Sequence, residues 1–230
     1  MEVSPAGRAR ILHGVMIKKL SEKYQQWNYF RKSKKTQAYS FKGIKIKILP
    51  GVFSPEGTRT TELFASYLLN EDWNKKKVLE LGAGSGLLSF LLCQKGAEVT
   101  ASDISENAID GIKQNSQALD LNVHAINSNL FEKLNERFDI IIINPPFFQK
   151  DPKSIAESAW YCGKNFDYFI ALFEQFSQRD LKEQIWMILS ENADIEMIES
   201  IALSKGLAIQ DKVNLETHDE KHVVFKISNK

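Results

Sequence analysis

From about residue 75 to its end, the sequence alternates short apolar runs with helical patterns, and this alternation constrains the fold most. A run of four to eight apolar residues is typical of a buried strand, whereas apolar residues three and four apart indicate one face of a helix. Strands that alternate with helices lie parallel in one sheet, and the helices cover it. The chain is therefore expected to be an α/β protein with a seven-stranded, mostly parallel sheet and helices on both faces.

The individual elements can be placed along the sequence from these patterns and from the residues that begin and end helices. Ser105 is a candidate N-cap, because its side chain can accept a hydrogen bond from the first helical turn. The last two strands have no helix between them and are expected to pair antiparallel. Strands are expected at 76–82, 97–103, 122–128, 137–143, 183–191, 207–214 and 221–228, and helices at 86–96, 105–120, 166–178 and 193–206.

The pattern before residue 75 is different. Residues 17–30 look helical, and residues 60–70 form an amphipathic helical pattern. Residues 41–51 alternate Ile with Lys, which predicts a half-exposed strand at a sheet edge or in a hairpin. We therefore expect two parts: a basic N-terminal extension over 1–50 and the main domain over 51–230.

Charge is distributed unevenly along the chain, although the net charge is only +1. Residues 1–50 hold 12 Lys and Arg against 2 Asp and Glu, a balance of +10, and the remainder holds 18 against 27, a balance of −9. The basic run RKSKK (31–35) lies close to Tyr24, Trp27, Tyr29 and Phe30. Basic charge beside aromatic rings suits a phosphate backbone with stacked bases, so RNA or the ribosome is a candidate partner.

Other classes of protein are disfavoured by composition. Two cysteines, Cys93 and Cys162, cannot build a disulfide framework, and neither has a second Cys or a His at metal-ligand spacing. No metal site is expected. No apolar run reaches the roughly 18 residues of a membrane helix, and the N-terminus does not read as a secretory signal. A cytoplasmic protein is expected.

A glycine-rich segment, LELGAGSGLL (79–88), comes directly off a predicted strand and opens a helix. Gly82, Gly84 and Gly86 allow a sharp turn and let a ligand approach the helix N-terminus. Glu80 would be awkward beside a pyrophosphate, so the segment favours a cofactor with a cationic end over a dinucleotide. Asp103 ends the next strand, where a carboxylate can accept hydrogen bonds from both ribose hydroxyls.

These features together resemble a class I S-adenosylmethionine-dependent methyltransferase, of the methyltransferase small domain and HemK-like group. The resemblance rests on E-x-G-x-G-x-G after the first strand, an acid after the second and N-P-P-F after the fourth, and it covers about residues 52–228. It implies a Rossmann-like fold and S-adenosylmethionine as cofactor. Where many relatives have an acid facing the adenine amino group, this chain has Asn129, whose carbonyl can accept the same hydrogen bond. The implied cofactor contacts are Glu80, Gly82, Ala83, Gly84, Gly86, Asp103, Ile104, Asn129 and Thr61.

The segment FDIIIINPPFFQK (138–150) ends a predicted core strand on Asn144, Pro145, Pro146 and Phe147. A planar amide or base amine is a poor nucleophile, because its lone pair is delocalised. The side-chain oxygen of Asn144 and the backbone carbonyl of Pro145 could hold its two hydrogens, and Phe147 could stack on the flat group. The prolines would keep this loop extended and rigid. These four residues are the predicted catalytic set for N-methyl transfer.

The substrate stays open at this point. N-P-P-F is shared by methyltransferases that act on adenine in DNA, on bases in ribosomal RNA and tRNA, and on a glutamine of release factors. Residues 51–69 are similar to a HemK-like segment in which Pro55 and Thr61–Glu62 would lie over the cofactor, and 161–175 resemble another segment loosely, with Asn165 and Phe166 departing from it. An RNA base and a protein glutamine of the translation machinery are therefore the leading substrates. The alternatives are an inactive RNA-binding module on the same scaffold and a DNA adenine methyltransferase.

Overall fold

The computed structural model describes residues 29–56, 58–179, 183–216 and 220–229 of the chain. The helix expected over 17–30 lies outside the described residues except for its last two, and Tyr24 and Trp27 also lie outside them. Residues 29–32 are helical.

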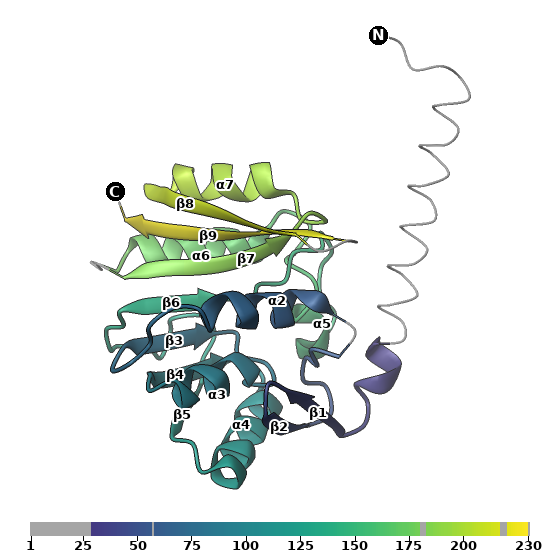
Figure 1. Ribbon diagram of the computed structural model, residues 1–230. Helices are drawn as coiled ribbons and strands as arrows, with labels where there is room; N and C mark the ends of the chain where they lie inside the picture. Colours follow the sequence, from purple (N-terminus) through teal and green to yellow (C-terminus); the bar gives the residue numbers. More distant parts are fainter. Residues whose placement is uncertain (1–28, 57, 180–182, 217–219, 230) are drawn as a thin grey trace.

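A seven-stranded sheet forms the centre of the domain, in the order β5-β4-β3-β6-β7-β9-β8 (Figure 1). Neighbouring strands from β5 to β7 pair parallel, whereas β9 pairs antiparallel with both β7 and β8. The expected fold class is confirmed, including the antiparallel last pair. The strands are β3 (Lys77–Leu81), β4 (Glu98–Asp103), β5 (Val123–Asn127), β6 (Ile140–Ile143), β7 (Gln184–Ser190), β8 (Leu207–Glu216) and β9 (Lys221–Asn229).

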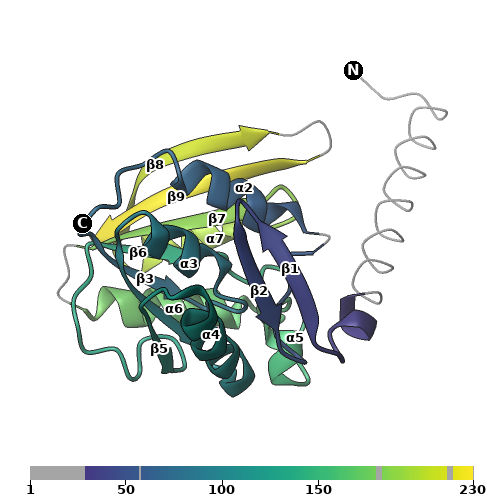
Figure 2. The same ribbon diagram turned by 60° about the horizontal axis from the view of Figure 1, so that its bottom comes forward.

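Helices cover both faces of this sheet (Figures 1 and 2). One apolar cluster joins α2, α3 and α4 to one face, and a second joins α6 and α7 to the other. A short helix, α5, lies between β6 and α6 and was not expected from the sequence. The helices are α2 (Arg59–Leu68), α3 (Leu87–Gln94), α4 (Glu106–Leu119), α5 (Ile155–Ser158), α6 (Asp167–Ser177) and α7 (Ile195–Ser204). The N-cap expected at Ser105 is confirmed, because its Oγ accepts from the Ala108 N–H at 3.4 Å.

The four isoleucines of β6 show why this strand lies at the centre. Ile142 packs in the cluster of α2, α3 and α4, whereas Ile141 and Ile143 pack in the cluster of α6 and α7. All three are fully buried, as a parallel strand with helices on both faces requires. The same alternation continues past the strand, so the next residue, Asn144, is directed to the α2 side.

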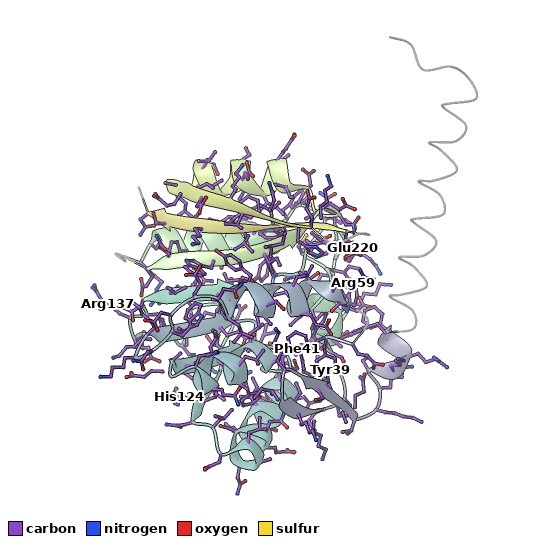
Figure 3. The ribbon with its side chains drawn as sticks, in the orientation of Figure 1. Tyr39, Phe41, Arg59, His124, Arg137 and Glu220 are labelled. Atoms are coloured by element: carbon purple, nitrogen blue, oxygen red, sulfur yellow. The ribbon has the colours of Figure 1, made fainter. Side chains whose placement is uncertain are left out.

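A separate hairpin of β1 (Gln37–Phe41) and β2 (Ile44–Ile48) packs beside α4. The strand expected over 41–51 was predicted to begin too early. Lys42 and Gly43 both have positive φ and form the tight turn between β1 and β2. The isoleucines of β2 are buried and its lysines are exposed. The Asn115 side chain of α4 both donates to the carbonyl and accepts from the N–H of Lys47, so two hydrogen bonds from one side chain hold the hairpin backbone to the main domain. Figure 3 labels Tyr39 and Phe41 on β1.

Candidate active site

A cavity of about 180 Å³ opens at the carboxyl ends of β3, β4 and β6. This is the edge where ligands bind in open parallel sheets. Two groups of residues line it: the glycine loop with the segments after β4 and β5, and the N-P-P-F loop with the start of α2 and the end of α5. All thirteen residues predicted for the cofactor and for catalysis are brought together here except Gly86, which supports the loop from behind.

Two of the three glycines in the loop serve different purposes. Gly82 and Gly86 have φ values of 74° and 75°, a conformation that residues with a Cβ rarely adopt. A Cβ on Gly82 would meet no atom within 4 Å, and Gly82 lines the cavity. A Cβ on Gly86 would lie 2.7 Å from Cγ1 of Ile112. Gly82 therefore leaves room for a ligand, whereas Gly86 lets α3 pack closely on α4.

Glu80 lies on β3 with a side chain only 5% exposed. Its face of the strand is the one that carries α3, and its Oε2 accepts hydrogen bonds from the Ser89 N–H at 2.8 Å and from the Ser89 hydroxyl. The carboxylate thus satisfies an otherwise unpaired N–H in the first turn of α3. Burial raises the pKa of Glu80 to about 8, and the two hydrogen bonds oppose that rise only in part.

Asp103 holds the glycine loop against the next helix. Its Oδ2 accepts from the Gly84 N–H and its Oδ1 from the Ser105 N–H, both at 2.8 Å. Burial raises the pKa of Asp103, and these two bonds counter the rise. Each carboxylate oxygen has a further lone pair, so the group that shapes the loop can still accept hydrogen bonds from a ligand in the cavity.

The remaining predicted cofactor residues lie around the same half of the cavity. Ala83 is buried, and its N–H donates to the Ser102 carbonyl at 2.9 Å. Ile104 is 44% exposed at the cavity, where its apolar side chain can pack on a flat ring. Asn129 donates through Nδ2 to Glu132 at 2.7 Å, and this bond leaves Oδ1 as an acceptor. The acceptor role expected of Asn129 is compatible with this geometry.

Asn144 extends from the end of β6 toward α2, where its Nδ2 donates to the Thr61 hydroxyl at 3.0 Å. The oxygen end of the amide is left for the cavity, which Asn144, Pro145, Pro146 and Phe147 all line. Thr61 was predicted as a cofactor contact from the HemK-like segment, and the structure gives it this contact to the predicted catalytic residue Asn144. The cavity therefore has an acceptor beside an aromatic ring, as the N-P-P-F chemistry requires.

The rest of that HemK-like segment departs from the expectation. Pro55 and Glu62 are not among the residues that line the cavity. The Glu62 carboxylate turns instead to the hairpin, where it accepts a hydrogen bond from the Tyr39 hydroxyl. The expectation that both residues lie over the cavity is therefore wrong, because the first turn of α2 directs Thr60 and Thr61 toward it and Glu62 toward the hairpin.

The loop after Phe147 is tied to the segment that follows α5. The Phe148 N–H donates to the Trp160 carbonyl at 3.1 Å, and the Cys162 N–H donates to the Phe148 carbonyl at 3.0 Å. The rings of Phe148 and Trp160 stack with centroids 5.9 Å apart and planes 19° from parallel. The Phe147 and Phe148 rings are 4.7 Å apart. These contacts give the cavity a wall of aromatic side chains.

Among the cavity residues that sequence reasoning missed are three aromatic ones: Phe53, Trp160 and Tyr168. Phe53 and Trp160 lie in irregular segments, so no periodicity marks them, and their rings are 5.9 Å apart. Burial and then the nearby charge of Asp103 raise the pKa of Tyr168. The one available signal was the density of aromatic residues around WYCG (160–163).

The basic segment reaches this aromatic wall. Tyr29 packs on Trp160 with ring centroids 4.8 Å apart. Lys32 pairs with Glu56 at 3.0 Å, whereas Lys34 and Lys35 are exposed. The described part of the segment therefore lies beside the cavity, not at the opposite edge of the sheet.

The remaining predictions concern a metal site, a membrane span and the two cysteines. No cluster of three or more His, Cys, Asp or Glu side chains within the described ranges could hold a metal ion. Nor does the described part of the chain include a helix both long and apolar enough for a membrane span. Both cysteines are free thiols. His124 lies exposed on β5, away from the cavity (Figure 3).

Known proteins resemble this chain in sequence. The methyltransferase small domain family matches residues 43–160. The ribosomal RNA small subunit methyltransferase C of Salmonella paratyphi B is 34% identical over 149 residues, which cover 64% of this chain and 41% of that protein. The same enzyme of Salmonella newport matches with the same identity and coverage. The chain spans about two fifths of the length of these curated relatives.

Solved structures share the fold at lower identity. The T. thermophilus 16S rRNA methyltransferase, in complex with AdoMet and guanosine, has a TM-score of 0.59 and 22% identity, over 85% of this chain and 50% of that one. The ribosomal protein L11 methylase of Lactobacillus delbrueckii has a TM-score of 0.57 and 19% identity, over 80% and 84%. One of these structures is named for an RNA and one for a protein, so the shared fold does not select between the two substrates.

Proposed function

Because the chain belongs to the methyltransferase small domain family, we propose that it is an S-adenosylmethionine-dependent N-methyltransferase that acts on an exocyclic amine of an RNA base. The observation that carries the proposal is the Asn144 amide. Thr61 holds its nitrogen end, and its oxygen end is left for a cavity that also contains the glycine loop. The match covers only part of the curated relatives, so their names support the proposal but do not carry it.

The residues of the cavity fit S-adenosylmethionine, which when bound supplies an electrophilic methyl group on a sulfonium. The open space at Gly82 leaves room for a ligand close to the backbone. Asp103 would accept from the ribose hydroxyls, and Asn129 would accept from the adenine amine through Oδ1. Glu80 offers Oε1 toward the cationic end, since both of its recorded hydrogen bonds go to Oε2. The ammonium, the ribose hydroxyls and the adenine amine of this cofactor would then each have an acceptor in the cavity.

The catalytic loop would act on the nucleophile by orientation. Oδ1 of Asn144 and the Pro145 carbonyl would each accept one hydrogen of the amine, which directs the nitrogen lone pair toward the methyl group. The oriented nitrogen would form the new bond to the methyl group, and the cofactor would supply that group and retain the electron pair of the broken sulfur–methyl bond. The methylated nitrogen is then acidic and loses its extra proton to water. No strong base is needed, and neither Asn144 nor Pro145 has to change protonation.

An RNA base is favoured over a protein glutamine by the shape and charge around the acceptor. Phe147, Phe148 and Trp160 present flat rings at the cavity, and a nucleobase stacks on such rings. The basic run 31–35 begins beside the same wall. The curated relatives at 34% identity are named as ribosomal RNA methyltransferases. These three observations together support RNA as the substrate class.

The proposal is tested by methyl transfer from radiolabelled S-adenosylmethionine to extract from cells that lack this protein, followed by ribonuclease, deoxyribonuclease or protease. We expect ribonuclease to remove the label, and deoxyribonuclease and protease to leave it in place. Label lost only with protease would move the proposal to a protein glutamine, and label lost with deoxyribonuclease to DNA adenine. If the protein binds the cofactor in calorimetry but transfers no label to any component of the extract, the proposed enzyme activity is refuted. The alternative of an inactive RNA-binding module would then remain.

A further inference from the structure

Thr61 makes one recorded side-chain hydrogen bond, and it goes to the catalytic amide rather than to the glycine loop. We propose that Thr61 is a positioning residue that sets which end of the Asn144 amide faces the substrate. The inference rests on the proposed function, because it assigns a role within the same site. It replaces the expectation that Thr61 serves mainly as a cofactor contact.

Asparagine needs such a partner because the two ends of its amide have opposite polarity. The oxygen end accepts hydrogen bonds, whereas the NH₂ end only donates them. If the amide of Asn144 rotated by half a turn, its NH₂ would face the NH₂ of the substrate, donor against donor. The 3.0 Å bond from Nδ2 to the Thr61 hydroxyl favours the productive orientation. Thr61 is only 5% exposed, so water has little access to replace its hydroxyl as the acceptor.

The helix that carries Thr61 is itself held on both sides of this residue. The Thr60 hydroxyl lies 3.1 Å from Nε2 of His222, which is fully buried on β9. Glu62 accepts a hydrogen bond from Tyr39 on the hairpin. Three consecutive residues of α2 therefore contact three different elements: Thr60 contacts β9, Thr61 contacts the loop after β6, and Glu62 contacts β1.

This anchoring gives the Thr61 hydroxyl a defined place relative to the end of β6. Hydrogen bonds weaken quickly as their geometry departs from the ideal, so a partner on a fixed helix orients an amide better than one on a mobile loop. Arg59, labelled in Figure 3, marks the start of this helix beside the sheet. The arrangement is what a positioning residue requires: a buried hydroxyl, a short bond to the reacting group and a rigid support.

The test compares Thr61→Val, which keeps the shape but removes the acceptor, with Thr61→Ser, which keeps the hydroxyl. We expect Thr61→Val to lower kcat about tenfold, since a neutral hydrogen bond contributes about that much. The Kd for S-adenosylmethionine should stay nearly unchanged, and Thr61→Ser should restore most of kcat. Ser66→Ala is the matched control: Ser66 lies on the same helix, donates to the Glu62 carbonyl at 2.8 Å, and is absent from the cavity lining.

Three results would overturn the inference. Unchanged kcat in Thr61→Val would show that the bond does not matter. If Thr61→Val lowers cofactor affinity as much as it lowers kcat, Thr61 is a cofactor contact and not a positioning residue. Equal defects in the Val and Ser variants would mean that packing, not the hydroxyl, is responsible.

A second measurement separates this inference from the proposed function. The side-chain amide signal of Asn144 in a ¹⁵N spectrum, assigned by its disappearance in Asn144→Asp, reports the bond without any substrate. We expect slower hydrogen exchange of this amide in wild type and Thr61→Ser than in Thr61→Val. If no substrate is methylated but this pattern holds, the proposed function fails while the Thr61 contact stands. If exchange is the same in all three proteins, the contact itself is refuted.

Discussion

At the scale of single residues, the Glu80 carboxyl group has a structural role at the start of α3, and the proposed function adds a binding role to it. Burial raises its pKa to about 8, so the free protein holds this group largely protonated at neutral pH. Because the folded pKa lies above the unfolded value, its contribution to stability is complete below the unfolded pKa and declines as the pH rises through about 8. A cation in the cavity would favour the ionised form and release a proton.

This proton release makes a prediction about pH. The affinity for S-adenosylmethionine should increase as the pH rises toward about 8 in the wild type, and the increase should be absent in Glu80→Gln. The glutamine variant keeps one acceptor for the Ser89 N–H, so α3 can still begin at the same residue. Calorimetry over a pH series in two buffers of different ionisation enthalpy measures both the affinity and the proton released. Parallel pH profiles for the two proteins would contradict the assignment.

Asn144 gives a second prediction at this scale. Asn144→Ala should lower kcat by at least ~10²-fold, the cost of losing one hydrogen-bonding group that acts in the transition state. Cofactor affinity should hardly change, because the recorded hydrogen bond of the Asn144 side chain goes to Thr61 and not to the glycine loop. Single-turnover methyl transfer and calorimetry measure the two quantities separately. Equal losses of both would make Asn144 a structural residue.

At the scale of elements, the glycine loop allows a paired test of backbone strain and space. Gly82→Ala and Gly86→Ala place a Cβ on nearly the same left-handed backbone, which costs about 1–2 kcal/mol in each case. Only Gly86→Ala also meets Ile112, so it should lose about 1–3 kcal/mol more in the free energy of unfolding. Urea denaturation measures this difference, and equal losses in the two variants would refute the packing role of Gly86. Gly82→Ala should mainly weaken cofactor binding.

The elements that could be predicted from sequence are those with a strong local signal. Four consecutive isoleucines indicate β6, and Ser105 with a clear apolar stripe indicates α4. Both elements were therefore predicted to within a few residues of their actual bounds. β1 was missed because QAYSF (37–41) is short and half-exposed, and its pairing with β2 depends on a turn at Lys42–Gly43. α5 has four residues and no buried side chain, so it carries no periodicity.

The site divides in the same way. Motif residues such as Gly82 and Asn144 are recognisable because their chemistry demands a residue type at a fixed spacing. Phe53 and Trp160 reach the cavity only through the tertiary path of irregular segments, and Trp160 depends on pairing with Phe148. The partner of Asn144 could not be read from sequence either, since 83 residues separate it from Thr61.

At the scale of the whole molecule, the described basic residues of the N-terminal extension begin beside the cavity. Within the basic extension, the described residues 29–50 hold 7 Lys and Arg and no Asp or Glu, and they begin at the aromatic wall of the cavity. The more acidic remainder includes the sheet and most helices. A polyanion would therefore be attracted to the cavity side of the molecule more than to the opposite edge.

This placement predicts how RNA binding responds to charge. Lys34→Glu with Lys35→Glu should raise the KM for RNA roughly tenfold at low salt, weaken its dependence on salt, and leave kcat and cofactor affinity nearly unchanged. Lys76→Glu with Lys95→Glu is the matched control, since both lysines are exposed and lie beside the start of β3 and the end of α3, opposite the cavity. Initial rates over a salt series measure the effect. An equal rise of KM in the control pair would show that only net charge matters, and no rise in either pair would remove residues 31–35 from the RNA-binding surface.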